Sequence, residues 1–151
     1  MDARGLTDQI VSILASSGWF ERVNKHEPKN APGRGVTASV WVQGVDPVKA
    51  SGLASTTIRV EFNARLMIPM LSEPQDDIDE NLLMTLDSVF NLFSGDFELG
   101  GNVNLRMIDL LGAHGTPLSA RAGYLTQDRI AYRTFLVVIP LIINDNWTQV
   151  A

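Results

Sequence analysis

Thr57-Ile-Arg-Val-Glu-Phe-Asn-Ala-Arg-Leu66 is the stretch that decides the fold. Apolar residues at every second position, from Ile58 to Leu66, alternate with polar ones. A period of two is typical of a β-strand that buries one face against a core. Residues 36–43 show the same alternation, and residues 44–54 between the two segments are predicted to form a long polar hairpin tip. The sequence therefore predicts an antiparallel strand pair with one buried face.

Two other segments have the period of a helix. The first, Thr7–Ser17, is expected to end at Gly18. The second is expected to begin at the capping-box pattern Ser72-Glu-Pro-Gln75. The acidic run Asp76-Asp77-Ile-Asp79-Glu80 suits the positive end of a helix dipole, and it lacks the spaced ligands of a calcium loop. The helix then presents one apolar stripe before Gly95: Ile78, Leu82, Leu86, Val89, Phe90 and Phe93.

A second strand pair is predicted from Val103–Leu111 and Arg129–Ile143, joined by the long loop Gly112–Asp128. The expected order is helix, strand, strand, helix, strand, strand. We predict one domain of the α+β class over residues 1–151, with two helices packed on an antiparallel or mixed sheet of about four main strands.

The last predicted strand is apolar on both faces from Phe135 onward. Such a strand is buried on both sides. Pro140 cannot donate a ladder hydrogen bond, so the strand is expected to be at an edge or bulged there. A bare apolar edge would aggregate, so either another subunit or the first helix is expected to cover it.

Composition excludes several classes of function. The chain has no cysteine, so disulfide and thiolate chemistry are excluded. The chain has a net charge of −5 and lacks the clustered basic patch of a nucleic-acid-binding module. The simplest interpretation of this mild acidity is that it keeps the protein soluble, and the alternative is a passage through which DNA slides. No signal-peptide core and no run long enough to span a bilayer is present, so we expect synthesis in the cytoplasm.

No catalytic or cofactor motif stands out. The histidines, His26 and His114, lack partners at zinc-ligand spacing. A triad of His114, Asp109 and Ser119 is conceivable, but no nucleophile elbow surrounds a serine, and His114 is better interpreted as holding its loop through backbone hydrogen bonds. No glycine-rich phosphate signature occurs. We expect no enzyme activity, metal or cofactor.

Trp41 is the most informative single side chain. It lies on the polar side of its predicted strand, and an exposed tryptophan among polar neighbours is typical of an interface. The alternative is that the first helix or the Asn24–Gly35 loop covers it within the chain.

Several segments resemble the tail terminator, or tail completion, proteins of long-tailed phages, particularly phages of actinobacterial hosts. The clearest is Ile108-Asp-Leu-Leu-Gly-Ala-His-Gly-Thr-Pro-Leu-Ser-Ala-Arg-Ala-Gly-Tyr124. The others are Ser17–Gly33, Glu73–Asp79, Ser94–Phe97 and Val138–Asp145. The resemblance implies a virion protein at the head–tail junction that forms a homohexameric ring, ends tail polymerisation and docks the head.

The expected partners are further copies of the chain, the tail-tube protein and the head-side connector, while genomic DNA passes through the lumen without specific binding. Two alternatives stay open: a related tail-tube or head-completion protein, and a small soluble enzyme or ligand-binding domain. The residues proposed for interaction are Trp41, His114, Leu118, Arg121, Tyr124, Leu125 and Phe135.

Overall fold

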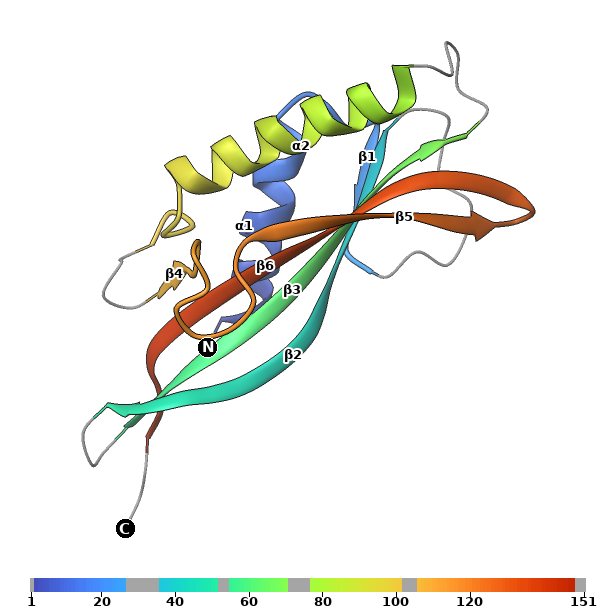
Figure 1. Ribbon diagram of the computed structural model, residues 1–151. Helices are drawn as coiled ribbons and strands as arrows, with labels where there is room; N and C mark the ends of the chain where they lie inside the picture. Colours follow the sequence, from blue (N-terminus) through green and yellow to red (C-terminus); the bar gives the residue numbers. More distant parts are fainter. Residues whose placement is uncertain (1, 27–35, 52–54, 71–76, 102–105, 149–151) are drawn as a thin grey trace.

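The computed structural model describes residues 2–26, 36–51, 55–70, 77–101 and 106–148. Along the described chain each of the two helices is followed by three strands (Figure 1). The elements are α1 (Ala3–Ser16), β1 (Arg22–Asn24), β2 (Thr37–Ser51), β3 (Ser55–Pro69), α2 (Ile78–Gly95), β4 (Arg106–Ile108), β5 (Ser119–Gln127) and β6 (Ile130–Thr148).

One mixed sheet organises these residues. Its strand order is β1-β2-β3-β6-β4, and β5 pairs with β6 as well. Among the strand pairs of the described residues, only β1–β2 is parallel. Both β4 and β5 lie on the side of β6 away from β3, with β4 beside residues 141–143 and β5 beside residues 130–138. The predicted α+β class is therefore confirmed, with more strands than the four expected.

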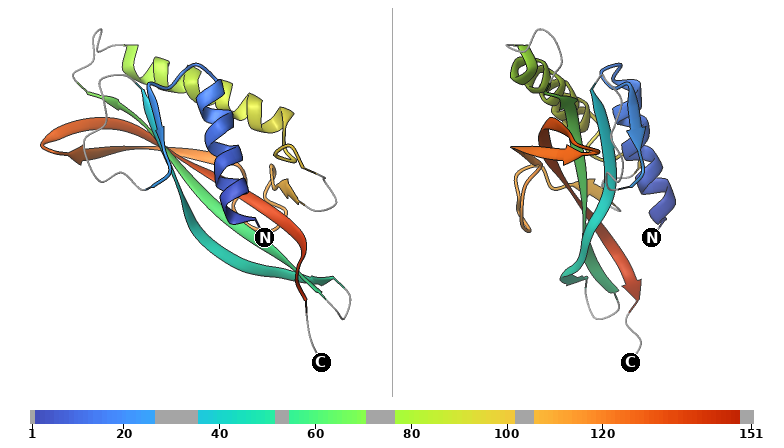
Figure 2. Two further views of the ribbon diagram at one scale, coloured as in Figure 1. Left: turned by 180° about the vertical axis from the view of Figure 1, so that it is seen from behind. Right: turned by 90° about the vertical axis from the view of Figure 1, so that its right-hand side faces the viewer.

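The core lies between the two helices and one face of the strongly twisted sheet (Figure 2). α1 packs against β1 and β2, and α2 packs across β3 and β6. The alternating apolar residues of the predicted strand, Ile58 to Leu66, are buried there as expected, whereas the polar face, which was predicted to be exposed, is also largely buried, at Thr57, Arg59 and Asn63. Burying a side chain such as Phe62 contributes about 1.5–3 kcal/mol relative to exposing it. The other buried members include Leu6, Ile10, Leu14, Leu82, Val89, Phe93, Val137, Ile139 and Leu141.

Both helices begin at positions that differ from the prediction. α1 starts earlier than Thr7, because the Asp2 carboxylate accepts a hydrogen bond of 3.0 Å from the Gly5 amide and caps the helix. α2 starts at Ile78, and the predicted capping box at residues 72–75 lies outside the described residues. Its apolar stripe faces the core as predicted.

The first hairpin is longer than predicted. Strand pairing continues from Thr37 with Met67 out to Ser51 with Ser55, so most of the expected polar tip at residues 44–54 belongs to β2. The register shifts between Val42 and Gly44 and again between Pro47 and Lys49. Each β-bulge adds a residue and breaks the period of two, which is why the sequence pattern seemed to end at residue 43.

The predicted loop at residues 112–128 is mostly a strand. Ser119–Gln127 pairs with β6, and the connection is a tight turn at Asp128 and Arg129, whose φ angles of 50° and 66° are those of a two-residue hairpin. In turn, the predicted strand at residues 103–111 is regular only at Arg106–Ile108 among the residues described.

The position of Pro140 also corrects the prediction. β6 is an interior strand, because β3 lies on one side and β4 and β5 lie on the other. The Pro140 carbonyl accepts a hydrogen bond of 2.9 Å from the Asp109 amide. An N–H group at residue 140 would point to the same side as this carbonyl, away from β3. On that side the partner of β6 changes from β4 to β5, so the proline removes no hydrogen bond of the ladder. Elements of the same chain therefore cover the strand that we expected another subunit or α1 to cover.

Candidate functional site

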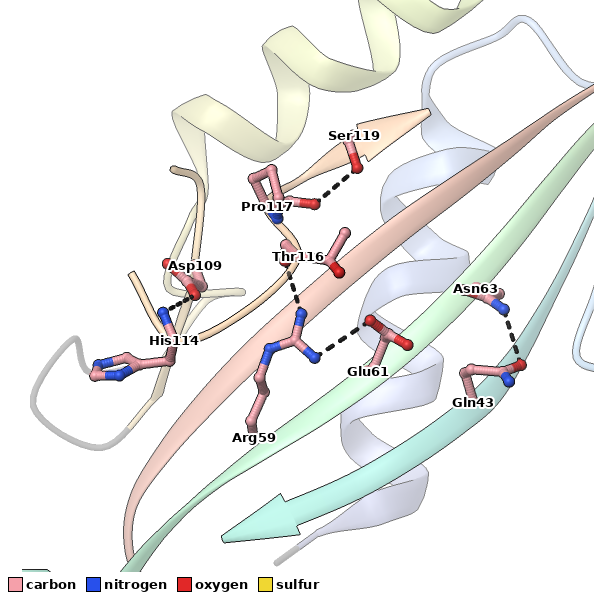
Figure 3. Close-up of polar contacts among 9 residues, drawn as sticks. All are labelled: Gln43, Arg59, Glu61, Asn63, Asp109, His114, Thr116, Pro117 and Ser119. Atoms are coloured by element: carbon pink, nitrogen blue, oxygen red, sulfur yellow. Dashed lines mark hydrogen bonds and ion pairs between the residues drawn. The ribbon is translucent and has the colours of Figure 1, made fainter. Parts of the chain in front are cut away.

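A compact polar cluster lies where the chain leaves β4 and returns as β5 (Figure 3). We call residues Asp109–Leu118 the edge loop. The Asp109 carboxylate is 3% exposed and accepts hydrogen bonds from the backbone amides of Ala113 (2.8 Å) and His114 (3.0 Å). Aspartate commonly closes turns in this way because its short side chain reaches amides a few residues on. The side chain of the first residue of the edge loop thus closes the loop through hydrogen bonds to its backbone.

Arg59 of β3 holds the edge loop from beneath. Its side chain is largely buried on the sheet face opposite the helices, and its Nη2 donates to the Thr116 carbonyl at 2.7 Å. Nη1 pairs with the Glu61 carboxylate at 3.2 Å. Burying a guanidinium is costly unless its charge is paired, so Glu61 compensates part of that cost. Its Nε has no hydrogen-bond partner among the described residues.

Two glycines allow the loop to pack this tightly. Gly112 has a φ of +76°, and a Cβ there would lie 2.6 Å from the Gly115 carbonyl oxygen. Gly115 in turn leaves room for Arg59, since a Cβ at this glycine would lie 3.1 Å from the guanidinium carbon. The loop therefore needs glycine at both positions, because a residue with a side chain would be strained there.

The conceivable triad is not assembled. The Asp109 carboxylate bonds backbone amides rather than the His114 imidazole, and the His114 residue is exposed. The Ser119 hydroxyl donates to the Pro117 carbonyl at 3.0 Å. These groups hold a loop, and their geometry does not place a base beside a nucleophile.

Trp41 lies on the sheet face opposite the helices. Its neighbours in β2, Ala38 and Val40, point into the core, so α1 packs on the other side of the strand and does not cover the indole. The Arg65 guanidinium lies 5.6 Å from the centroid of the Trp41 ring, and Trp41 is half-buried. Residues 27–35, the alternative cover, lie outside the described residues.

Tyr124 is 71% exposed and lies under the guanidinium of Arg133, 4.5 Å from the ring centroid. Arg133 also donates to the Gly123 carbonyl at 3.2 Å and pairs with Asp79 in the first turn of α2 at 2.9 Å. This cluster joins the β5–β6 hairpin to α2. Of the remaining proposed interaction residues, Arg121 is exposed and the others are half-buried: Leu118, Leu125 and Phe135.

Three apolar residues near the sheet edges are exposed against expectation, and one of them, Val42, belongs to the alternation over residues 36–43 that was predicted to be buried. Leu111 was predicted to end a strand, yet it is 94% exposed in the edge loop. Val42 and Val45, at 51% and 41% exposure, lie on the opposite edge in β2. Exposure of these residues depends on where the sheet stops, which strand periodicity alone does not define.

Within the described part of the chain, no three carboxylate or histidine side chains gather as metal ligands. No helix among the residues described is long and apolar enough to cross a membrane.

No protein-family model matches the sequence, and none of the curated proteins compared with it matches either. Two solved structures are similar to the fold. One, identified by a sequence label alone, is 16% identical, with a TM-score of 0.51 over 98% of this chain and 93% of that chain. The other is the sheath/tube terminator of an extracellular contractile injection system in its extended state, 10% identical, with a TM-score of 0.45 over 99% of this chain and 58% of that chain.

Proposed function

We propose that this protein is a structural subunit of a phage tail that closes the tail tube as a homohexameric ring. In this role it ends tail polymerisation, seats on the tail-tube protein and provides the docking surface for the head-side connector. It acts at the head–tail junction of the virion, and DNA passes through its lumen without specific binding. The sequence segments that resemble tail terminators support this assignment.

The observation that carries the proposal is a pair of β-arms that project past the helix layer at opposite ends of the sheet (Figure 1). β2 and β3 have 15 residues each and β6 has 19, against a usual strand length of about 5–6 residues. A projecting hairpin is marginal in water by itself, so a contact with a neighbour would stabilise it.

Exposed apolar side chains lie on both arms. Tyr124 and Ile130 are exposed on the β5–β6 arm, at 71% and 39%. Trp147 is exposed on the other arm, at 44%, and Val45, at 41%, lies in β2 where that arm begins. Aromatic side chains such as Tyr124 and Trp147 are enriched at protein interfaces. Two arms with separate apolar surfaces fit a subunit that contacts neighbours on more than one side.

The buried polar groups of the described residues favour a structural role over the enzyme alternative. The Asp109 side chain accepts hydrogen bonds from the backbone of the edge loop, and Arg59 donates to that backbone and to Glu61. A catalytic acid or base needs instead to reach a substrate proton. The tail-tube alternative differs in assembly, because a tube subunit polymerises without limit whereas a terminator closes a ring.

Deletion of the gene from the phage that encodes it tests the proposal. We expect filled heads separate from tails, with tails of abnormal length, and restoration of normal particles when the protein is supplied in trans. Complementation with a Leu83→Ser variant, changed at an exposed position of α2 away from both arms, serves as the control. Normal tails joined to heads in the deletion phage would overturn the proposal.

A further inference from the structure

One long edge of the sheet has no partner among the described residues. β5 pairs with β6 on one side, and no other described strand lies on its other side, which we call the β5 edge. The pairing with β6 is regular over nine residues, from Ser119 with Val138 to Gln127 with Ile130. At about 3.3 Å per residue, the β5 edge is roughly 30 Å long. An unpaired edge of this length can accept a further strand.

The register defines which backbone groups face the β5 edge. Because the turn between the strands has two residues, Gln127 and Ile130 exchange both of their backbone hydrogen bonds. In an antiparallel pair the backbone groups of successive residues point alternately toward the partner strand and away from it. The N–H groups that point away from β6 therefore belong to Ala120, Ala122, Tyr124 and Thr126.

Hydrogen bonds on both sides of the hairpin agree with this alternation. On the β3 side of β6, the Ala131 carbonyl accepts a hydrogen bond of 2.9 Å from the Met70 amide. On the free side of β5, the Ala120 carbonyl accepts one of 3.0 Å from the Arg121 guanidinium. Residues 122, 124 and 126 are exposed. A partner can therefore reach a row of backbone donors and acceptors along the β5 edge.

The other long edge of the same sheet is protected, whereas the β5 edge is not. β2 has two register shifts, and Asp46, Pro47 and Lys49 lie along it. Bulges, proline and charged residues are the features by which proteins prevent unwanted strand pairing. β5 has no register shift and no proline, and its one charged residue is Arg121. The fold thus leaves open an edge of the kind that accepts a strand from a partner.

The charge of the hairpin indicates which segment fits this edge. Residues 119–134 contain three arginines and one aspartate, although the whole chain carries −5. Arg133 is paired with Asp79, while Arg121 is exposed and has no ion pair within the described part of the chain. Opposite charges on neighbouring strands stabilise their pairing, and like charges destabilise it. A second copy of β5 would bring another arginine to this face, so an acidic segment is the better match.

We propose that the β5 edge binds an extended, acidic segment of another protein, which joins the sheet as a further strand. The backbone of this segment bonds the outward groups of Ala122, Tyr124 and Thr126 and supplies the affinity, while a carboxylate beside Arg121 supplies the selectivity. The proposal concerns the single subunit and goes beyond the ring, so failure of either leaves the other standing.

A peptide titration followed by nuclear magnetic resonance tests the binding on the purified full chain. The probe is an acetylated and amidated peptide as long as β5 in which threonine alternates with glutamate, and its matched control has lysine in place of glutamate. We expect the glutamate peptide to slow hydrogen exchange at the outward amides, such as those of Ala122 and Tyr124. The intervening amides, such as that of Gly123, should change little, because they already bond β6.

Variants separate the backbone contribution from the charge contribution. In the unchanged protein we expect the glutamate peptide to bind roughly fivefold more tightly than the lysine peptide, and Arg121→Glu should reverse this order. Ala122→Pro removes an outward N–H without breaking the ladder with β6, and it should abolish the slowed exchange at the other outward amides. Ala122→Ser keeps the N–H and should bind like the unchanged protein. Circular dichroism checks the fold of each variant.

Every outcome bears on the proposal. Alternating protection along β5 by the glutamate peptide, with the order of the peptides reversed in Arg121→Glu, supports it. No protection, equal effects of the two peptides, or slowing that does not alternate along β5 overturns it. Slowed exchange without peptide, together with sedimentation as a dimer, would place a second copy at the edge and also overturn it. If Ala122→Pro unfolds, the Arg121→Glu comparison still decides, because that variant keeps every backbone group.

Discussion

At the scale of single residues, Gly112 shows how conformation and space combine in the edge loop. Gly18 has a similar φ of +78° but meets nothing within 4 Å of an added Cβ, whereas an added Cβ at Gly112 (φ +76°) meets the Gly115 carbonyl at 2.6 Å. Gly18→Ala should therefore lower the free energy of unfolding by about 1 kcal/mol through strain alone. Gly112→Ala should lower it by about 2–4 kcal/mol, because overpacking is added. Urea denaturation of both variants measures the difference, and equal losses would show that the loop is not tightly packed.

Tyr132 is expected to make the stability of the fold depend on pH in the alkaline range. The side chain is 1% exposed, and burial raises the pKa of its phenol above the usual value, with the Asp128 carboxylate adding to the effect. Because the unfolded chain releases this proton first, the contribution of Tyr132 to stability is complete below about pH 10 and declines as the pH rises through the folded pKa.

Tyr132→Phe should remove that decline. We expect the free energy of unfolding of the variant to fall less steeply above about pH 10 than that of the unchanged protein, measured by urea denaturation across the alkaline range. Tyr124→Phe, which alters an exposed phenol, should keep the steep decline. Parallel pH profiles for the protein and Tyr132→Phe would contradict the argument.

At the scale of elements, Arg133 sets how the β5–β6 hairpin sits against α2. Its guanidinium contacts the Tyr124 ring, the Gly123 carbonyl and Asp79. The Asp79 side chain is 71% exposed, so this ion pair alone contributes little. We expect Arg133→Met to cost about 1–3 kcal/mol of stability and Asp79→Asn at most about 0.5 kcal/mol. If Asp79→Asn costs as much as Arg133→Met in chemical denaturation, the ion pair is the dominant tie.

How far the elements could be predicted depends on how regular their pattern is. The strand at residues 57–66 and the stripe of α2 bury one face throughout, so their periods appear in the sequence. β5 is an edge strand with mostly exposed or half-exposed residues and small side chains, so it carried no apolar alternation and looked like a loop. Bulges hid the second half of β2 in the same way.

The candidate site was harder to predict than the fold. The sequence identified the segment from Ile108 to Tyr124 as special, and the structure places a closed loop in its first part and a strand in its second. It could not identify Arg59, because its partner Thr116 is distant in sequence and the bond depends on the register of three strands. The exposed valines of β2 were missed for the same reason: their exposure follows from the position of the sheet edge.

At the scale of the whole molecule, charge predicts how the assembly treats DNA. One chain carries −5, so a hexamer would carry six times that charge, or −30. We expect no measurable binding of duplex DNA near physiological salt, because few clustered cations are available to release counterions from the phosphates. A gel-shift assay checks this, with a basic DNA-binding protein as the positive control. Tight binding that weakens steeply with salt would contradict a lumen through which DNA slides.

The central claim is that identical copies of this chain close a ring at the end of a tail tube. Cryo-electron microscopy of intact particles, with the protein located by a tag, tests it most directly. The proposal predicts one closed six-membered ring at the head-proximal end of each tail. An open helical polymer running along the tail, or particles without the protein, would contradict it.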